Sequence, residues 1–171
     1  MNTDLLLERR SIRKYKDTPV PEELIDKILE AGTFAPTGMN RQTPVMVAVT
    51  NKATIDLLEK ANAKVMGDED RKPFYGAPAL IIVFRDPEVY TGFEDACLVM
   101  GNLLNAACAV GLGSCWIHRA KEVFETPEGK KLMKEWGVPE NFIGVGNCIL
   151  GYADEAPLAK PRKDGYFIKV K

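Results

Sequence analysis

The segment from Phe93 to Leu112 constrains the fold more than any other part of this sequence. It is apolar on almost every face of a helix, apart from Glu94 and Asp95 at one end and Asn102 and Asn105 inside. Its length approaches that of a membrane span, but two carboxylates and two internal amides favour a central core or interface helix. A small domain cannot easily bury such a helix on every side, so we expect a second subunit to cover one face.

Shorter segments on both sides of this helix show helical or strand patterns. Helices are predicted from Thr3 through the basic run at 9–13 and ending before Lys16, and at 21–31, 53–65 and 128–136. Strands are predicted at 45–50, 79–84 and 141–152, with a short strand or turn at 114–118. The apolar end, 166–170, could add an edge strand to a neighbouring subunit. Consecutive helices and widely spaced strands indicate one α+β domain over residues 1–171.

Charge argues against two classes of partner. The chain has 23 Lys and Arg against 24 Asp and Glu, and its formal net charge is -1. This balance gives no general attraction to a polyanion or an anionic membrane, and no long basic face is interleaved with aromatic residues. We therefore expect neither a nucleic acid nor a membrane as partner, and any phosphate site must be built locally.

The cysteine and histidine content indicates the cellular compartment and argues against metal-dependent and hydrolytic chemistry. The run Leu5 to Leu7 is too short for a secretory signal, and the four cysteines form no CxxC pair. Reduced thiols of this kind suit the cytoplasm. The one histidine, His118, has no neighbours at ligand-like spacing, so we expect no metal site. The same scarcity argues against hydrolases that use a Ser-His or Cys-His pair.

Two basic clusters could bind a phosphate. Arg9 and Arg13 would share a helical face if the first helix persists, with Arg10 and Ser11 nearby. Guanidinium groups match phosphate oxygens, and the serine hydroxyl adds a neutral donor. A solvated basic helix end explains this cluster equally well. The second cluster is Lys160-Pro161-Arg162, where the proline favours an extended backbone with both cations on one side.

Four segments together carry a resemblance to a known family. The runs 9–13, 35–44, 111–117, and Gly151-Tyr152 followed by 160–162 resemble the successive signature segments of the nitroreductase family. They occur in that family's order and span nearly the whole chain. The resemblance implies an α+β fold with a mostly antiparallel central sheet flanked by helices, in an interlocked homodimer with FMN at the subunit interface.

The resemblance also implies a role for each segment. Arg9, Arg10 and Ser11 would hold the FMN phosphate, with Lys160 and Arg162 joining from the C-terminal segment. Arg13 would lie near the flavin N1 and C2 carbonyl, where a cation stabilises the reduced ring. The implied FMN-binding residues are Arg9, Arg10, Ser11, Arg13, Pro36, Thr37, Gly38, Asn40, Gln42, Cys115, Trp116, Ile117, Lys160 and Arg162, those from 36 to 42 being contributed by the second subunit.

The implied activity is a ping-pong transfer. NADH or NADPH would reduce the flavin, and a small electron-poor acceptor such as a nitroaromatic or a quinone would then be reduced, with no side-chain nucleophile. Two features depart from the family pattern: Gly101-Asn102 stands where many relatives have Gln-Asn, and Arg71 and Lys72 match no assigned contact. Alternatives are a flavin-consuming oxygenase, a reductive dehalogenase, a non-catalytic flavin-binding or sensing protein, and a flavin-free protein that binds a phosphorylated partner.

Overall fold

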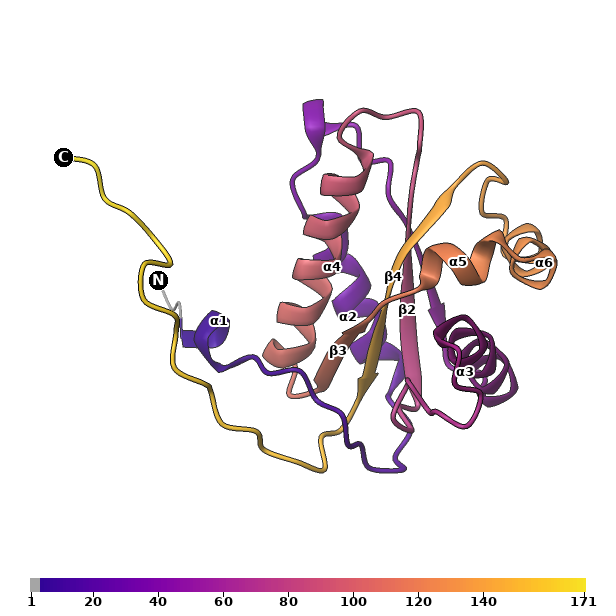
Figure 1. Cartoon of the computed structure of the whole chain (residues 1–171), viewed down its shortest axis with the longest axis horizontal. Helices are drawn as coiled ribbons and strands as arrows, with labels where there is room; N and C mark the ends of the chain where they lie inside the picture. The colour runs from indigo at the N-terminus through magenta and orange to yellow at the C-terminus, as the bar shows by residue number, and fades with distance from the viewer. Residues whose placement is uncertain (1–3) are drawn as a thin grey trace.

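Four antiparallel strands form the centre of the structure, a computed structural model that describes residues 4–171 (Figure 1). The strands are β1 (Val45–Val49), β2 (Ala79–Arg85), β3 (Gly113–Ile117) and β4 (Ile143–Gly151), and they lie in the order β1-β2-β4-β3. Every neighbouring pair is antiparallel, and β3 lies at one edge. The prediction of an α+β fold with a mostly antiparallel sheet is confirmed.

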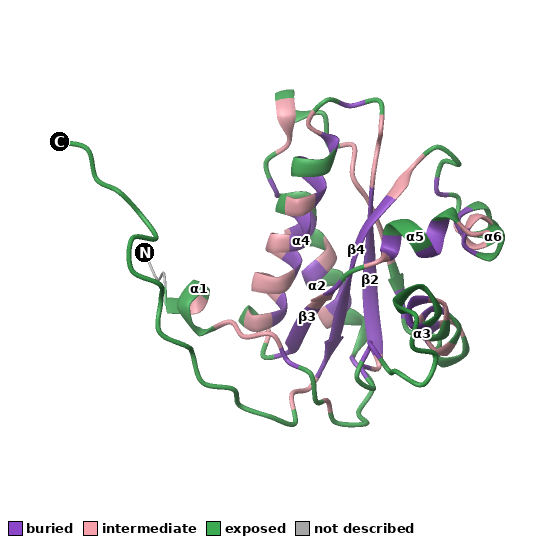
Figure 2. Ribbon diagram, in the orientation of Figure 1, coloured by how far each residue is buried: buried purple, intermediate pink, exposed green. Residues whose placement is uncertain are grey.

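Helices cover both faces of this sheet. One face packs against α2 (Glu22–Thr33) and α4 (Gly92–Ala109), and the other packs against α3 (Lys52–Met66), α5 (Ala120–Glu125) and α6 (Pro127–Glu135). Strand β2 supplies both cores, because alternate side chains point to opposite faces: Ile81 joins the first cluster and Ile82 the second. Figure 2 shows the buried strands between the two helical layers.

Most predicted elements are found within a few residues of the expected ends. Local signals explain these ends: Asn51 accepts a hydrogen bond from the Thr54 amide at 3.0 Å and caps α3, and Thr126 accepts one from the Gly129 amide at 3.1 Å and caps α6. Pro21 precedes α2, as its fixed φ favours.

The first helix is much shorter than predicted. Its expected start at Thr3 lies outside the described residues, and α1 (Asp4–Glu8) ends before the basic run begins. Arg9 and Arg13 therefore do not share a helical face. Backbone pairing replaces the helix here, because Ser11 forms a parallel bridge with Ser114 and Tyr15 an antiparallel bridge with Ala153.

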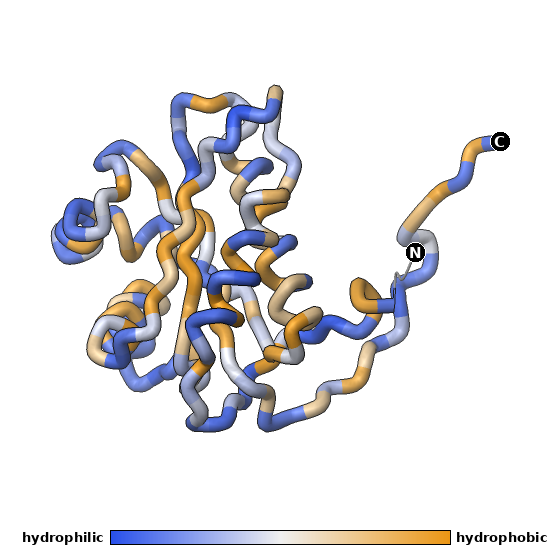
Figure 3. Tube along the Cα trace, turned by 180° about the vertical axis from the view of Figure 1, so that it is seen from behind, coloured by the Kyte–Doolittle hydropathy of each residue, from blue (hydrophilic) through white to orange (hydrophobic). Residues whose placement is uncertain are grey.

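The short helix α5 was not predicted, although Ala120, Val123 and Phe124 have helical spacing and are buried. Within one chain the tail at 166–170 is exposed coil, and it lies apart from the core in Figure 3. Its pairing with a neighbouring subunit stays a prediction. The central helix α4 has one face open within one chain, since Phe93 is 53% exposed and Leu98 48%. Cover of this face by a second subunit also stays a prediction. Among residues 4–171, no helix is both long and apolar enough to cross a bilayer.

Candidate functional site

The basic run 9–13 is an extended segment fixed against the edge of the sheet. The amide of Ile12 donates to the Ser114 carbonyl at 3.0 Å, and the Ile12 side chain is buried. The Tyr15 hydroxyl donates to the Ile12 carbonyl at 2.8 Å, and burial raises the pKa of this phenol, so it remains a neutral donor. Because side chains alternate along an extended chain, burial of Ile12 directs its neighbours Ser11 and Arg13 away from the core.

A glycine permits this close approach. A Cβ at Gly113 would lie 2.8 Å from Cγ1 of Ile12, well inside normal contact distance. The segment also joins the end of β4, where the Lys16 amide donates to the Tyr152 carbonyl at 2.9 Å and Lys14 pairs with Asp154 at 2.7 Å. The ion pair raises the pKa of Lys14 and lowers the pKa of Asp154. The position of the basic run is thus set by its contact with β3 at Ile12 and by contacts just beyond its C-terminal end.

Two cavities lie along this segment. The Arg9 cavity has a volume of about 450 Å³ and is lined by Arg9, Arg10, the 111–114 turn and residues 156–158. The Arg13 cavity has a volume of about 310 Å³ and is lined by Arg13, the 71–73 segment and residues 115–119. No acidic side chain lines the Arg13 cavity. A ligand with a phosphate at one end and a ring at the other could lie along β3 and occupy both.

The cations at these cavities differ in availability. Arg10 is engaged, since its Nη1 donates to the Leu7 and Arg9 carbonyls, both at 2.7 Å. Arg71 pairs with Asp68 at 3.1 Å. Within residues 4–171, Arg9 and Arg13 form no side-chain ion pair. Their guanidinium groups are therefore free to bind an anion.

The other predicted residues on β3 line the Arg13 cavity. Cys115 and Ile117 are buried on the α3 side of the sheet, whereas Trp116 is half-buried on the α4 side. The indole packs over Gly146, where a Cβ would come within 2.4 Å of its Nε1, and this buried N–H has no partner in the described chain. Burial raises the pKa of the neighbouring Cys148 thiol, which stays protonated.

Two buried asparagines escaped sequence analysis. Asn62 on α3 donates to the His118 carbonyl at 2.8 Å, and Asn147 on β4 donates to the Ile117 carbonyl at 3.2 Å. These bonds fix the main chain where β3 enters the Arg13 cavity. An amide on the apolar stripe of a helix or strand is the signal that could have identified them.

The predicted loop 35–44 contains a short 3-10 turn, η1 (Gly38–Asn40), and has an unusual backbone. Met39, Asn40 and Gln42 have φ of 56°, 54° and 53°, in the left-handed region that non-glycine residues rarely adopt. The Gln42 side chain donates to Asn40 Oδ1 at 2.9 Å, and the Gln42 amide donates to Thr37 Oγ1 at 3.0 Å. Such conformations cost about 1–3 kcal/mol each and cluster at functional sites.

A buried carboxylate attaches this loop to α4. Asp95 accepts hydrogen bonds from the Gly38 amide at 2.9 Å and from Thr91 Oγ1 at 3.0 Å. The anchor lies near the start of α4, whereas Cys108, which lines the Arg9 cavity, lies near its end. At about 1.5 Å of rise per residue, these positions are roughly 20 Å apart. The structure therefore does not bring Pro36, Thr37, Gly38, Asn40 or Gln42 to the Arg9 cavity of the same chain.

Lys160 and Arg162 are also not gathered at the cavities within one chain. Both lie in the exposed tail, and the Arg162 guanidinium donates to the Lys160 carbonyl at 2.6 and 3.2 Å. The preceding residues 156–158 do line the Arg9 cavity, and the tail then runs past α1 (Figure 1). A phosphate contact from these two residues stays a prediction.

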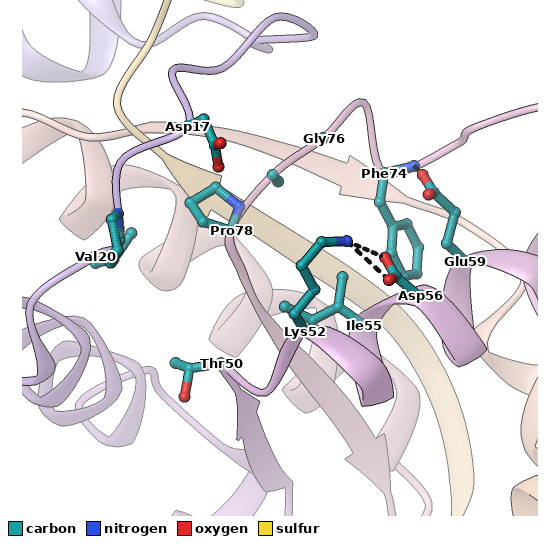
Figure 4. A pocket seen from close by; sticks show the side chains of 12 residues that line it. Asp17, Val20, Thr50, Lys52, Ile55, Asp56, Glu59, Phe74, Gly76 and Pro78 are labelled. Atoms are coloured by element: carbon teal, nitrogen blue, oxygen red, sulfur yellow. Dashed lines mark hydrogen bonds and ion pairs between the residues drawn. The ribbon is translucent and has the colours of Figure 1, made fainter.

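A further cavity, the Asp17 cavity, is lined by residues 17–20, the start of α3 and the 74–78 segment (Figure 4). It has a volume of about 240 Å³ and three acidic residues in its lining, and its one cation, Lys52, pairs with Asp56 at 2.8 Å. Glu59 accepts a hydrogen bond from the Phe74 amide at 2.8 Å. The lining of this cavity therefore offers no unpaired cation for a phosphate. In the described chain, no three His, Cys, Asp or Glu side chains gather as metal ligands do.

Comparisons with known proteins agree with this geometry. The Nitroreductase family model matches residues 6–152. A relative from Methanothermobacter thermautotrophicus, whose name carries the terms NADH dehydrogenase and NAD(P)H nitroreductase, is 33% identical over 87% of this chain and 75% of its own length. The crystal structure of a nitroreductase with bound FMN from Bacteroides fragilis has a TM-score of 0.89 and 31% identity, covering 100% of both chains. A nitroreductase with bound FMN from Desulfitobacterium hafniense has the same TM-score at 27% identity and equal coverage.

Proposed function

Because the chain belongs to the nitroreductase family, we propose that it is an FMN-dependent oxidoreductase that passes electrons from NAD(P)H to a small electron-poor acceptor. The observation that carries this proposal is the pair of neighbouring cavities along β3, each with a guanidinium that forms no ion pair within the described residues. Bound FMN would supply two-electron chemistry, accepting hydride from the nicotinamide and returning electrons to the acceptor.

The residues present fit this cofactor. Arg9 lies at the start of the basic run and lines the Arg9 cavity, and Ser11, in the middle of the run, would add a hydroxyl for a phosphate. Arg13 opens onto the other cavity, where a fixed cation favours added electron density at the pyrimidine edge of the ring. Cys115, Trp116 and Ile117 form the wall against which a planar ring can lie.

The family resemblance also suggests the order of events. We expect donor and acceptor to approach the bound ring at the Arg13 cavity in turn, which gives ping-pong kinetics. No side-chain nucleophile is needed, and the protein orients the substrate and excludes water.

The test has two parts. Purified protein mixed with FMN should retain a yellow flavin spectrum after gel filtration. It should then oxidise NADH or NADPH with a nitroaromatic or quinone acceptor, with parallel lines in double-reciprocal plots. A colourless protein without this turnover contradicts the proposal, and a flavin-bound protein without turnover supports the non-catalytic alternative.

We further propose that the functional unit is a homodimer. The loop 36–42 lies roughly 20 Å along α4 from the Arg9 cavity of its own chain, so we expect its exposed amides to contact a cofactor held by a second copy. Large apolar side chains are exposed near this loop and in the tail: Phe34, Met39, Phe93, Leu98, Phe167 and Ile168. A partner that packs on α4 would cover several of them.

A matched pair of variants tests the dimer. Leu98→Glu places a charge on the exposed face of α4 and should give a monomer that does not retain FMN. Leu57→Glu is the control, because Leu57 is 47% exposed on α3, on the opposite side of the sheet, against 48% for Leu98. Sedimentation velocity separates the two forms, and a dimeric Leu98→Glu protein argues against α4 as the interface.

The four free thiols support a reducing compartment such as the cytoplasm.

A further inference from the structure

The Arg13 cavity continues into a second space whose charge the proposed function does not use. This Arg85 cavity has a volume of about 320 Å³ and shares His118 and Arg119 with the Arg13 cavity. Its other walls come from the end of β2, the first turn of α4, α5 and the start of β4. A substrate in the Arg13 cavity could therefore extend a substituent into it.

The Arg85 cavity is strongly basic. Three cationic side chains, those of Arg85, Arg119 and Lys121, line it together with one carboxylate, Glu122, and Lys121 pairs with Glu125 at 3.9 Å. Arg85 and Arg119 are half-buried, and neither side chain has an ion pair or hydrogen bond within residues 4–171. A guanidinium has five donors and binds carboxylate and phosphate in a fork, so these two side chains can hold an anion.

The backbone at Arg119 is a second, independent indication. Arg119 has a φ of 75°, a left-handed conformation that glycine adopts without strain and arginine does not. Strained positions of this kind mark functional sites more often than ordinary surface. The neighbouring helix is seated tightly, because a Cβ at Gly144 would lie 2.7 Å from the Ala120 carbonyl. Arg119 is thus held at the junction of the two cavities.

We propose that the Arg85 cavity is an anion-binding subsite that receives a carboxylate or phosphate group of a substrate whose reacting part occupies the Arg13 cavity. This inference rests on the proposed function and specifies its substrate class. The apolar lining beside the cations, Phe93, Ile143 and Val145, suits the rest of an aromatic acceptor. The same charge could instead hold the ribose phosphate that distinguishes NADPH from NADH.

Two pairs of substrates distinguish an anionic group on the acceptor from the ribose phosphate of NADPH. For acceptors, kcat/KM is compared between 4-nitrobenzoate and the neutral 4-nitrobenzyl alcohol; for donors, between NADPH and NADH. One charged hydrogen bond should give a preference of about tenfold for the anionic member of a pair. Preference only among acceptors assigns the subsite to the acceptor, and preference only among donors assigns it to NADPH. Absence of both preferences overturns the inference.

Variants of Arg85 and Arg119 test whether these residues cause the preference for the anionic substrate. Arg85→Gln and Arg119→Gly should each lower the anionic-to-neutral ratio about tenfold. Glycine suits a φ of 75°, so Arg119→Gly should also raise the melting temperature, which separates lost recognition from lost folding. Lys60→Gln is the control, because this exposed lysine on α3 lines none of the described cavities. An unchanged ratio in both arginine variants overturns the assignment.

A binding measurement keeps the subsite testable if turnover is absent. Calorimetric titration of the purified FMN-treated protein compares benzoate with benzyl alcohol, which differ in charge at similar size. Benzoate should bind about tenfold more tightly, and added salt should reduce the difference. If neither the nitro compounds nor a quinone is reduced, the proposed function fails. In that case, benzoate binding no tighter than benzyl alcohol overturns the subsite as well.

Discussion

Replacing Gly113 with alanine should destabilise the fold and weaken FMN binding together. The added Cβ would lie 2.8 Å from Cγ1 and 3.0 Å from Cβ of Ile12. Apolar carbons pack at about 3.5–4.0 Å, so the 9–13 segment would have to retreat by roughly 1 Å. Overpacking of this kind costs about 1–3 kcal/mol, whereas alanine returns at most about 1 kcal/mol by restricting the unfolded chain.

We expect a net loss of about 1–2 kcal/mol in the free energy of unfolding, measured by urea titration at one fixed FMN concentration. The urea midpoint should fall while the m-value is unchanged. Because Arg9 and Ser11 move with the displaced segment, equilibrium dialysis should show weaker FMN retention in the same variant. The two readouts should change together.

The double variant Ile12→Ala/Gly113→Ala tests the cause. Truncation of Ile12 costs stability by itself, but it removes the two γ carbons that the new Cβ meets, so the two changes should be less than additive. Additive losses would show that the contact with the γ carbons of Ile12 is not the source. A Gly113→Ala protein as stable as the parent would refute the close approach between the basic run and β3.

Three other perturbations have definite outcomes. Arg13→Ala should lower the flavin reduction potential and slow reduction by NAD(P)H in stopped flow, and Arg13→Lys should restore part of both; full speed in Arg13→Ala refutes the role. Asp95→Ala leaves the Gly38 amide without its acceptor and should cost about 1.5–3 kcal/mol in thermal unfolding, more than Asp95→Asn. Burial raises the pKa of Cys148, so its thiolate is scarce below that pKa and alkylation of the native protein at pH 8 should spare it. Mass spectrometry showing Cys148 modified as fast as half-exposed Cys97 would contradict this burial.

Local sequence patterns predicted the elements in which the long-range packing agrees with the local periodicity. The apolar stripe of α2 and the buried run of β2 each specify one structure, because helical and strand periods differ and long-range contacts agree with both. The basic run 9–13 shows the limit. Its residues are compatible with a helix, yet the bridge between Ser11 and Ser114 holds them beside β3. Periodicity cannot reveal this pairing, because Ser114 lies about a hundred residues further along the chain.

The same limit applies to the candidate site. Arg9, Arg13 and residues 115–117 were predicted from the family resemblance, and the structure places them along the two adjoining cavities. The loop 36–42 and the pair Lys160 and Arg162 are not brought there, because one chain supplies only half of the proposed assembly. Asn62 was missed since its role, fixing the His118 carbonyl, depends on α3 crossing the end of β3.

The position of β3 at the sheet edge explains why such modest sequence motifs can form a cofactor site. One side of β3 pairs with β4, and on the other side the Ser114 carbonyl accepts the hydrogen bond from Ile12. Main-chain groups alternate in direction along a strand, so those of Trp116 lie on the same outer edge, beyond the end of the basic run. An edge strand with unpaired main-chain groups can hydrogen-bond a ring whatever its side chains are. The side chains that must be specific are the cations, which is why the arginines at 9 and 13 carry more information about function than the strand that they flank.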